Sequence, residues 1–317
     1  MIVKIRKNWG ILTCLAILVS GCSPQTATRD GEASLPRVVS TSTIIADLAQ
    51  DVGGDRIEHT GILEPGADPH VYEPVPEDSI ALEKANLIFY NGYNLEPGLI
   101  KLMKTAGSNA QQVAVGEVVK PLDFEYEGQK QPDPHVWGDV KNAIAMVEVI
   151  RDSLIELSPE DRELFTQNAT TEIEKLQKLD VWVKEQINTI PALRRKLITT
   201  HDAFQYYATA YGLEVAGTLI GISTEEQPSA QTVQKLVEEI KNLGVPAIFA
   251  ETTINPQLIK TVAEEANIKL ADRELYSDSI GAPGSDGDSY IKMIVANTTA
   301  IVEALGGTVS DFSLENS

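Results

Sequence analysis

The chain has 317 residues, of which 43% are hydrophobic, enough apolar residues for a globular protein. Its formal net charge of -20 excludes the basic patches that phosphate recognition needs, so we expect no nucleic-acid partner. An acidic surface favours the approach of cations, although solubility alone also explains it. The length exceeds what one ordinary core organises, so two domains are expected.

The N-terminus has the pattern of a secretion signal. Lys4, Arg6 and Lys7 precede an apolar run at residues 11–19, which is too short to span a membrane comfortably. The run ends in Val-Ser-Gly-Cys, which resembles a bacterial lipobox in which Cys22 is acylated after cleavage. A secretory signal without lipidation is the alternative, but a cysteine at this position in a chain with 2 cysteines favours lipidation.

Cleavage before Cys22 predicts a signal peptide at residues 1–21. Cys14 leaves with the signal, so no disulfide is expected in the mature chain. Residues 22–36 are polar and predict a flexible tether. We therefore expect an extracytoplasmic protein that is lipid-anchored to a bacterial membrane, in the periplasm or on the outer cell surface.

Short apolar segments alternate with helical ones in residues 37–158. Strands are expected at residues 37–42, 58–63 and 86–91, and helices at residues 44–52 and 76–84. This alternation predicts an α/β lobe with a mostly parallel sheet.

A long helix is expected at residues 159–190. Ser158 and Asp161 resemble a capping box, Pro159 suits the first turn, and Pro191 ends the pattern. At ~1.5 Å per residue, the helix is on the order of 48 Å long, enough to connect two lobes rigidly. A coiled coil is the alternative use of its apolar stripe, but the spacing lacks sustained heptads.

The same alternation returns in residues 191–309 and predicts a second α/β lobe. Strands are expected at residues 196–200, 213–221, 247–251 and 268–271. Helices are expected at residues 203–211, 232–242, 256–267 and 289–305. An acidic tail follows at residues 310–317.

Three of the 4 histidines lie in small polar clusters: His70 and His135 in Asp-Pro-His, and His201 in Thr-His-Asp. Each is predicted in a loop near a strand end or a helix start, where ligands bind in open α/β folds. Imidazole is the commonest metal-donating side chain, so a site assembled from both lobes is one interpretation. Three unrelated surface or capping histidines are the other. His59 belongs to no motif and is interpreted as a surface or packing residue.

Four motifs carry a family resemblance: GADPHVYEPVPEDSIALEKANLIFYNG, DPHVWGD, THDAFQYYATAYGL and YSDSIGAPGSDGDSYIKMI. In this order after a lipobox, they resemble the zinc/manganese-binding lipoprotein family of metal ABC importers, over about residues 37–305. The resemblance implies two lobes joined by one long helix, with metal at the lobe interface. The implied ligands are His70, His135, His201 and Asp278. At the third of these positions, members of the family carry either His or Glu.

The residues alone do not single out Asp278, because several acids lie near it: Asp272, Glu274, Asp286 and Asp288. An acidic loop before a helix is usually solvated or capping. The choice of Asp278 therefore rests on the resemblance. Glu251, at the end of a predicted strand, is expected to hold a ligand histidine by its other ring nitrogen, with an ordinary strand-end carboxylate as the alternative.

Three imidazoles and one carboxylate suit Zn²⁺, and Mn²⁺ fits if Asp278 binds through both oxygens. The resemblance implies that a glutamate at the third position accompanies manganese, while histidine accompanies zinc or mixed specificity. The chain lacks the His-rich loop of many zinc-binding members. We expect the bound ion to be Zn²⁺ in preference to Mn²⁺, and to be the ligand that the protein transports.

The function implied by the resemblance is capture of a divalent metal and its delivery to an ABC permease and its ATPase, without enzymatic activity. A secreted metal-dependent hydrolase is the alternative class, but it needs an open water position, and no HExxH motif is present. A surface adhesin is a third class. We expect a monomer that loses its metal below about pH 6, as the histidines protonate.

Overall fold

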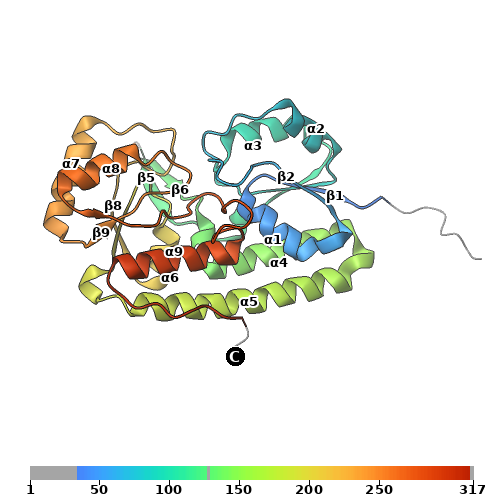
Figure 1. Ribbon diagram of the computed structural model, residues 1–317. Coiled ribbons are helices and arrows are strands. Elements are labelled where there is room, and N and C mark those ends of the chain that lie inside the picture. The colour runs from blue at the N-terminus through green and yellow to red at the C-terminus, as the bar shows by residue number, and fades with distance from the viewer. Residues whose placement is uncertain (1–33, 127–128, 315–317) are drawn as a thin grey trace, which may run out of the picture. The chain divides into compact units, whose positions relative to one another are not determined.

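The computed structural model describes residues 34–126 and 129–314. The predicted signal peptide, Cys22 and most of the predicted tether lie outside the described residues. Leu35–Ser317 cluster as one compact unit. Figure 1 shows how its helices and strands are arranged.

The N-terminal half is built on a parallel sheet with the strand order β2-β1-β3-β4. Its strands are β1 (Arg37–Ser40), β2 (Glu58–Gly61), β3 (Leu87–Tyr90) and β4 (Gln111–Ala114). Its helices are α1 (Thr43–Gly53), α2 (Pro76–Lys84) and α3 (Pro97–Met103). Because strand side chains alternate, Val38 and Phe89 enter the main core beside α1, whereas Val39 and Ile88 pack with residues of α2 and α3.

The C-terminal half carries a second set of parallel strands. They are β7 (Lys196–Thr199), β8 (Glu214–Thr218), β9 (Ala247–Ile248) and β10 (Lys269–Leu270). β7 pairs with β8 and β9 with β10, and the Phe249 amide donates to the Ile198 carbonyl at 2.9 Å to join the two pairs. The helices of this half are α6 (Gln205–Tyr211), α7 (Ala230–Leu243), α8 (Gln257–Ala266) and α9 (Tyr290–Ala304).

Two long helices lie beneath the strands: α4 (Val140–Leu157), which packs on α1, and α5 (Arg162–Asn188), which runs beneath both sets of strands (Figure 1). α5 contacts α1 and α4 as well as α6 and α9. Its apolar stripe is therefore buried within its own chain. This is the packing that the sequence predicted, in preference to a coiled coil. At ~1.5 Å per residue its 27 residues measure about 40 Å, less than predicted, because Pro159–Asp161 form a separate 3-10 turn.

Several short or polar elements were not predicted from the sequence. They are α3, β4, and the antiparallel hairpin of β5 (Asp123–Tyr126) and β6 (Gln129–Pro132). β4 is an edge strand with the sequence QQVA, which has no alternation of apolar and polar residues. The other 3-10 turns are Gly54–Arg56, Val115–Val118, Val136–Gly138 and Ala192–Arg194.

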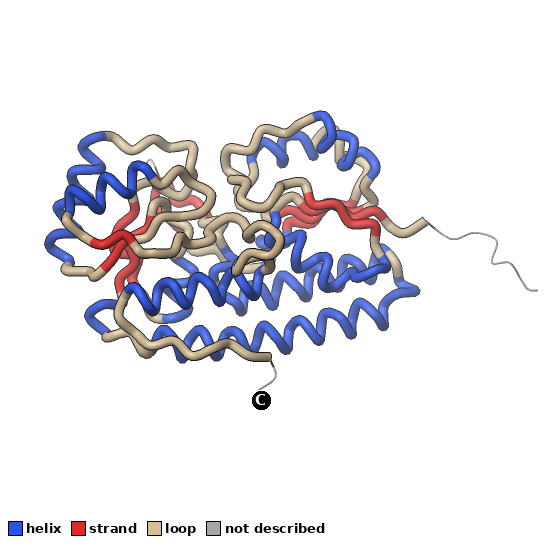
Figure 2. The backbone as a smooth tube through the Cα atoms, in the orientation of Figure 1, coloured by secondary structure: helices blue, strands red, loops and turns tan. Residues whose placement is uncertain are grey.

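The predicted fold class is confirmed: the chain is α/β, with parallel strands and one long helix spanning both halves. The loops that follow the strands of the two halves meet between them (Figure 2). The exact domain boundaries, including residues 158/159 and 190/191, stay predictions.

Of the predicted tail, residues 310–314 lie along α5, where Trp182 Nε1 donates to the Ser310 carbonyl at 3.0 Å. In the described ranges, no helix combines the length and apolar character needed to cross a membrane.

Candidate metal centre

Four loops bring the predicted ligands together. His70 lies between β2 and α2, and His135 immediately precedes the 3-10 turn at Val136–Gly138. His201 follows β7, and Asp278 lies between β10 and α9. All four side chains are buried, with residue exposures from 0% to 4%. The carboxyl ends of strands thus supply part of the site, as expected for an open α/β fold.

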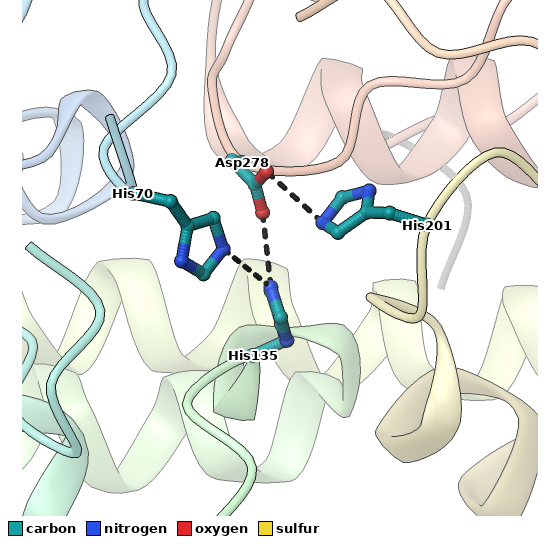
Figure 3. A group of neighbouring side chains, drawn as sticks. All are labelled: His70, His135, His201 and Asp278. Carbon is teal, nitrogen blue, oxygen red and sulfur yellow. Dashed lines mark hydrogen bonds and ion pairs between the residues drawn. The ribbon is translucent and has the colours of Figure 1, made fainter. Parts of the chain in front are cut away.

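The donor atoms converge on one point (Figure 3). The Nε2 atoms of His70 and His135 lie 3.2 Å apart. Asp278 Oδ1 lies 3.3 Å from His135 Nε2, and Asp278 Oδ2 lies 3.2 Å from His201 Nε2. Four donors at about 2.0 to 2.1 Å from a tetrahedral ion would lie about 3.3 Å from one another. These three distances match a small divalent cation at the centre, and all the donor atoms lie within 4.8 Å of one another.

Several of these atoms have no hydrogen-bond partner within the described part of the chain. They are His201 Nε2 and both carboxylate oxygens of Asp278, all fully buried. Burying unpartnered polar atoms is costly, and burying a carboxylate more so. A cation held by all four groups would satisfy them at once, so the residues present fit a metal ion.

Two of the histidines are held by carboxylates behind them. Asp133 Oδ1 accepts hydrogen bonds from the His135 backbone amide (3.0 Å) and from His135 Nδ1 (2.8 Å). Glu251 Oε1 accepts from the His201 amide at 2.8 Å, while Glu251 Oε2 contacts His201 Nδ1. The contact predicted for Glu251 is present. A proton on Nδ1 leaves Nε2 of each ring as the metal donor.

His70 is held differently. Asp68 Oδ1 accepts a hydrogen bond from the His70 backbone amide at 2.9 Å. Among the described residues, however, no carboxylate contacts the His70 ring nitrogen that faces away from the cluster. Asp68 instead uses its other oxygen to accept from Thr224 Oγ1 at 2.6 Å, across the boundary between the two halves. The His70 ring is thus the least constrained of the three.

The protonation of the cluster is set by burial and by its carboxylates. Burial lowers the pKa of His70 to about 3, so this ring is neutral, as a metal ligand must be. Burial also disfavours charge on His135, but its contacts with Asp133 and Asp278 outweigh burial and raise its pKa to about 9. His201, beside Glu251 and Asp278, likewise has a pKa well above the ordinary value. Without metal, the site therefore holds protons in place of the cation.

The other acids of the loop before α9 lie outside the cluster. Asp272 and Glu274 are exposed, Asp286 accepts from the Tyr276 hydroxyl at 2.7 Å, and Asp288 pairs with Lys292 at 2.6 Å. Only Asp278 from this loop joins the group that could hold a metal. His59 lies apart as expected, and its Nε2 is 2.9 Å from Ser40 Oγ.

Asp68 and Asp133, the carboxylates that hold the amides of the first two histidines, were not predicted from the sequence. The repeated Asp-Pro-His motif is the signal that would have found them, because an aspartate readily accepts a hydrogen bond from the amide two residues later. Asn91 was not predicted either. Its Nδ2 donates to the Pro134 carbonyl at 2.9 Å and so fixes the loop that carries His135.

Comparison with known proteins identifies the family. The model of the family described as "Zinc-uptake complex component A periplasmic" matches residues 38–304. The chain belongs to this family. The match covers both halves of the fold and all four loops of the cluster.

Individual relatives align with this chain over nearly their whole length. The manganese-binding lipoprotein MntA of Halalkalibacterium halodurans is 33% identical over 93% of this chain and 97% of its own. The manganese ABC transporter substrate-binding lipoprotein scaA of Streptococcus gordonii is 36% identical over 93% and 97%. The solved structure of the periplasmic zinc-binding protein TroA from Treponema pallidum superposes with a TM-score of 0.81 at 34% identity, covering 86% of this chain and 99% of TroA.

These relatives decide between the functional classes that the sequence left open. Members of the zinc-uptake component A family are solute-binding components of ABC importers, not enzymes. The hydrolase alternative has no support among them. Their names include both zinc and manganese, so the family alone does not select the ion.

Proposed function

We propose that this protein captures a divalent transition metal through His70, His135, His201 and Asp278 and delivers it to the permease of an ABC importer, which its ATPase drives. The observation that carries the proposal is the convergence of three imidazole nitrogens and one carboxylate from four separate loops. Three of the donor pairs lie 3.2 to 3.3 Å apart, and all the donor atoms lie within 4.8 Å of one another. The family membership supplies the transporter as partner.

The proposed ion is Zn²⁺ or Mn²⁺, with Zn²⁺ bound more tightly at equilibrium. Three nitrogens and one oxygen at tetrahedral spacing suit Zn²⁺, and the Irving–Williams order places it above Mn²⁺. Each Asp278 oxygen faces a different histidine, so both are available to a larger ion with more ligands. The manganese in the names of MntA and scaA supports this second use of the site.

Native mass spectrometry of the metal-free protein titrated with Zn²⁺ or Mn²⁺ tests the proposal. We expect one ion per chain, and a monomer throughout, because one chain supplies all four donors. In a competition, Zn²⁺ displaces Mn²⁺. Elemental analysis of protein purified from its own host then shows which ion the cell supplies. Absence of stoichiometric binding of either ion would overturn the proposal.

We further propose that Cys22 carries the lipid that anchors the mature protein to the bacterial membrane. Lipoprotein names among the relatives support an extracytoplasmic, anchored protein. A Cys22→Ser variant expressed in the host is expected to move from the membrane fraction to the soluble fraction. An unchanged membrane fraction would contradict the anchor.

A further inference from the structure

A cavity of about 200 Å³ lies beside the cluster and reaches it at His70. The other lining residues include Tyr93, Phe124, Pro134, Ile222 and Glu226. None of the other three donors lines it, and they are buried to 99% or more. His70 is therefore the donor through which the cluster meets this cavity.

The Asp68–Thr224 hydrogen bond stands between this cavity and a second one. The second cavity measures about 440 Å³, and both Asp68 and Thr224 line it. The adjacent residues Ser223 and Glu225 line the cavity beside His70. The bond thus joins the loop of the first ligand to the loop after β8, across the space between the two halves.

We propose that Thr224 is a positioning residue for His70, acting through Asp68, and that it controls how fast the metal leaves the site. This inference rests on the proposed function. Thr224 holds one oxygen of the Asp68 carboxylate, and the other oxygen holds the His70 amide. The chain of contacts therefore runs from the C-terminal half to the backbone of the ligand.

The contrast among the three histidines explains why this contact matters for His70. Asp133 and Glu251 each hold the amide and the ring of their histidine. The His70 ring has no such support, so its position depends on its backbone, which Asp68 fixes. Loss of the Thr224 hydroxyl frees the Asp68 carboxylate and lets His70 move toward the adjoining cavity.

A second contact keeps the fold intact when Thr224 is changed. The Gly66 amide donates to Ser279 Oγ at 2.7 Å, which ties the same loop to the segment that carries Asp278. Ser279 Oγ also lies 3.1 Å from Thr43 Oγ1. We therefore expect substitution of Thr224 to change the kinetics of the site without abolishing binding.

The test compares Thr224→Val, which lacks the hydroxyl at nearly the same volume, with Thr224→Ser, which keeps it. Release of Zn²⁺ to an excess of chelator is followed by stopped flow. We expect release to be about tenfold or more faster in Thr224→Val, the range set by a hydrogen bond to a charged group. Thr224→Ser should restore the wild-type rate. The matched control is Thr261→Val, because Thr261 also lines the second cavity but its hydroxyl donates to the Gln257 carbonyl within α8.

A double variant shows whether Thr224 acts through His70. If it does, Thr224→Val adds nothing to the release rate of His70→Ala. The inference is overturned if Thr224→Val releases at the wild-type rate, if Thr224→Ser is as fast as Thr224→Val, or if the two substitutions act independently. Each of these results requires wild-type protein that binds metal, whereas failure of the wild type to bind overturns the proposed function itself.

Discussion

Alanine at His70 or His201 is expected to lower the affinity for Zn²⁺ by more than about 100-fold. Loss of a carboxylate behind a metal ligand already costs about 10- to 100-fold, and loss of the ligand itself costs more. The two variants differ in the metal-free state. His201→Ala removes the ring that faces Glu251 Oε2 and leaves this buried carboxylate with the backbone amide of residue 201, which destabilises the fold by up to about 3 to 5 kcal/mol. His70→Ala leaves no such charge, so it should fold nearly as stably as the wild type.

Isothermal titration measures the affinities, and thermal unfolding of the metal-free proteins measures stability. His59→Ala is the matched control, because His59 is a partly buried histidine that bonds Ser40 and lies outside the cluster. It should bind Zn²⁺ as the wild type does. Wild-type affinity in both His70→Ala and His201→Ala would contradict the ligand assignment.

Metal affinity is expected to rise with pH well beyond the ordinary histidine range, up to about pH 9. In the metal-free protein the raised pKa values of His135 and His201 keep protons on the rings that must bind metal. The ion must displace these protons, so each one costs about tenfold in affinity per pH unit below its pKa. His70, with a pKa of about 3, contributes nothing in this range. The sequence placed the loss of metal below about pH 6, and the carboxylate contacts move this window upward.

The same protons stabilise the metal-free fold, so its stability should fall as the pH rises, whereas the metal affinity should increase. The pKa of His135 is above its unfolded value of 6.5, so its contribution to stability is complete below pH 6.5 and is lost as the pH rises through about 9. Titrations with Zn²⁺ at pH 6, 7, 8 and 9 in buffers of different ionisation enthalpy measure both affinity and proton release. An affinity that is flat across this range, with no protons released, would contradict the expected protonation.

Local sequence patterns determined much of the fold. The alternation of apolar strands and amphipathic helices placed β1, β3, β7, α1, α2 and α9 within a few residues of their observed bounds. Such patterns succeed because a residue's burial depends on the period of its element. They failed for β4 and β6, whose sequences QQVA and QKQP have no alternation, and for β5, whose alternating sequence DFEY is only four residues long.

The residues of the candidate site also fall into two groups: those that a local sequence pattern indicates and those that it does not. His70, His135 and His201 stood out by residue type and local motif, whereas Asp278 needed the family resemblance because the acids around it look alike in sequence. Only the tertiary structure decided that Asp278 turns inward and that Thr224 reaches Asp68 from the other half of the fold. Contacts between loops some 150 residues apart depend on how the two halves pack on α4 and α5, and no local pattern encodes that packing.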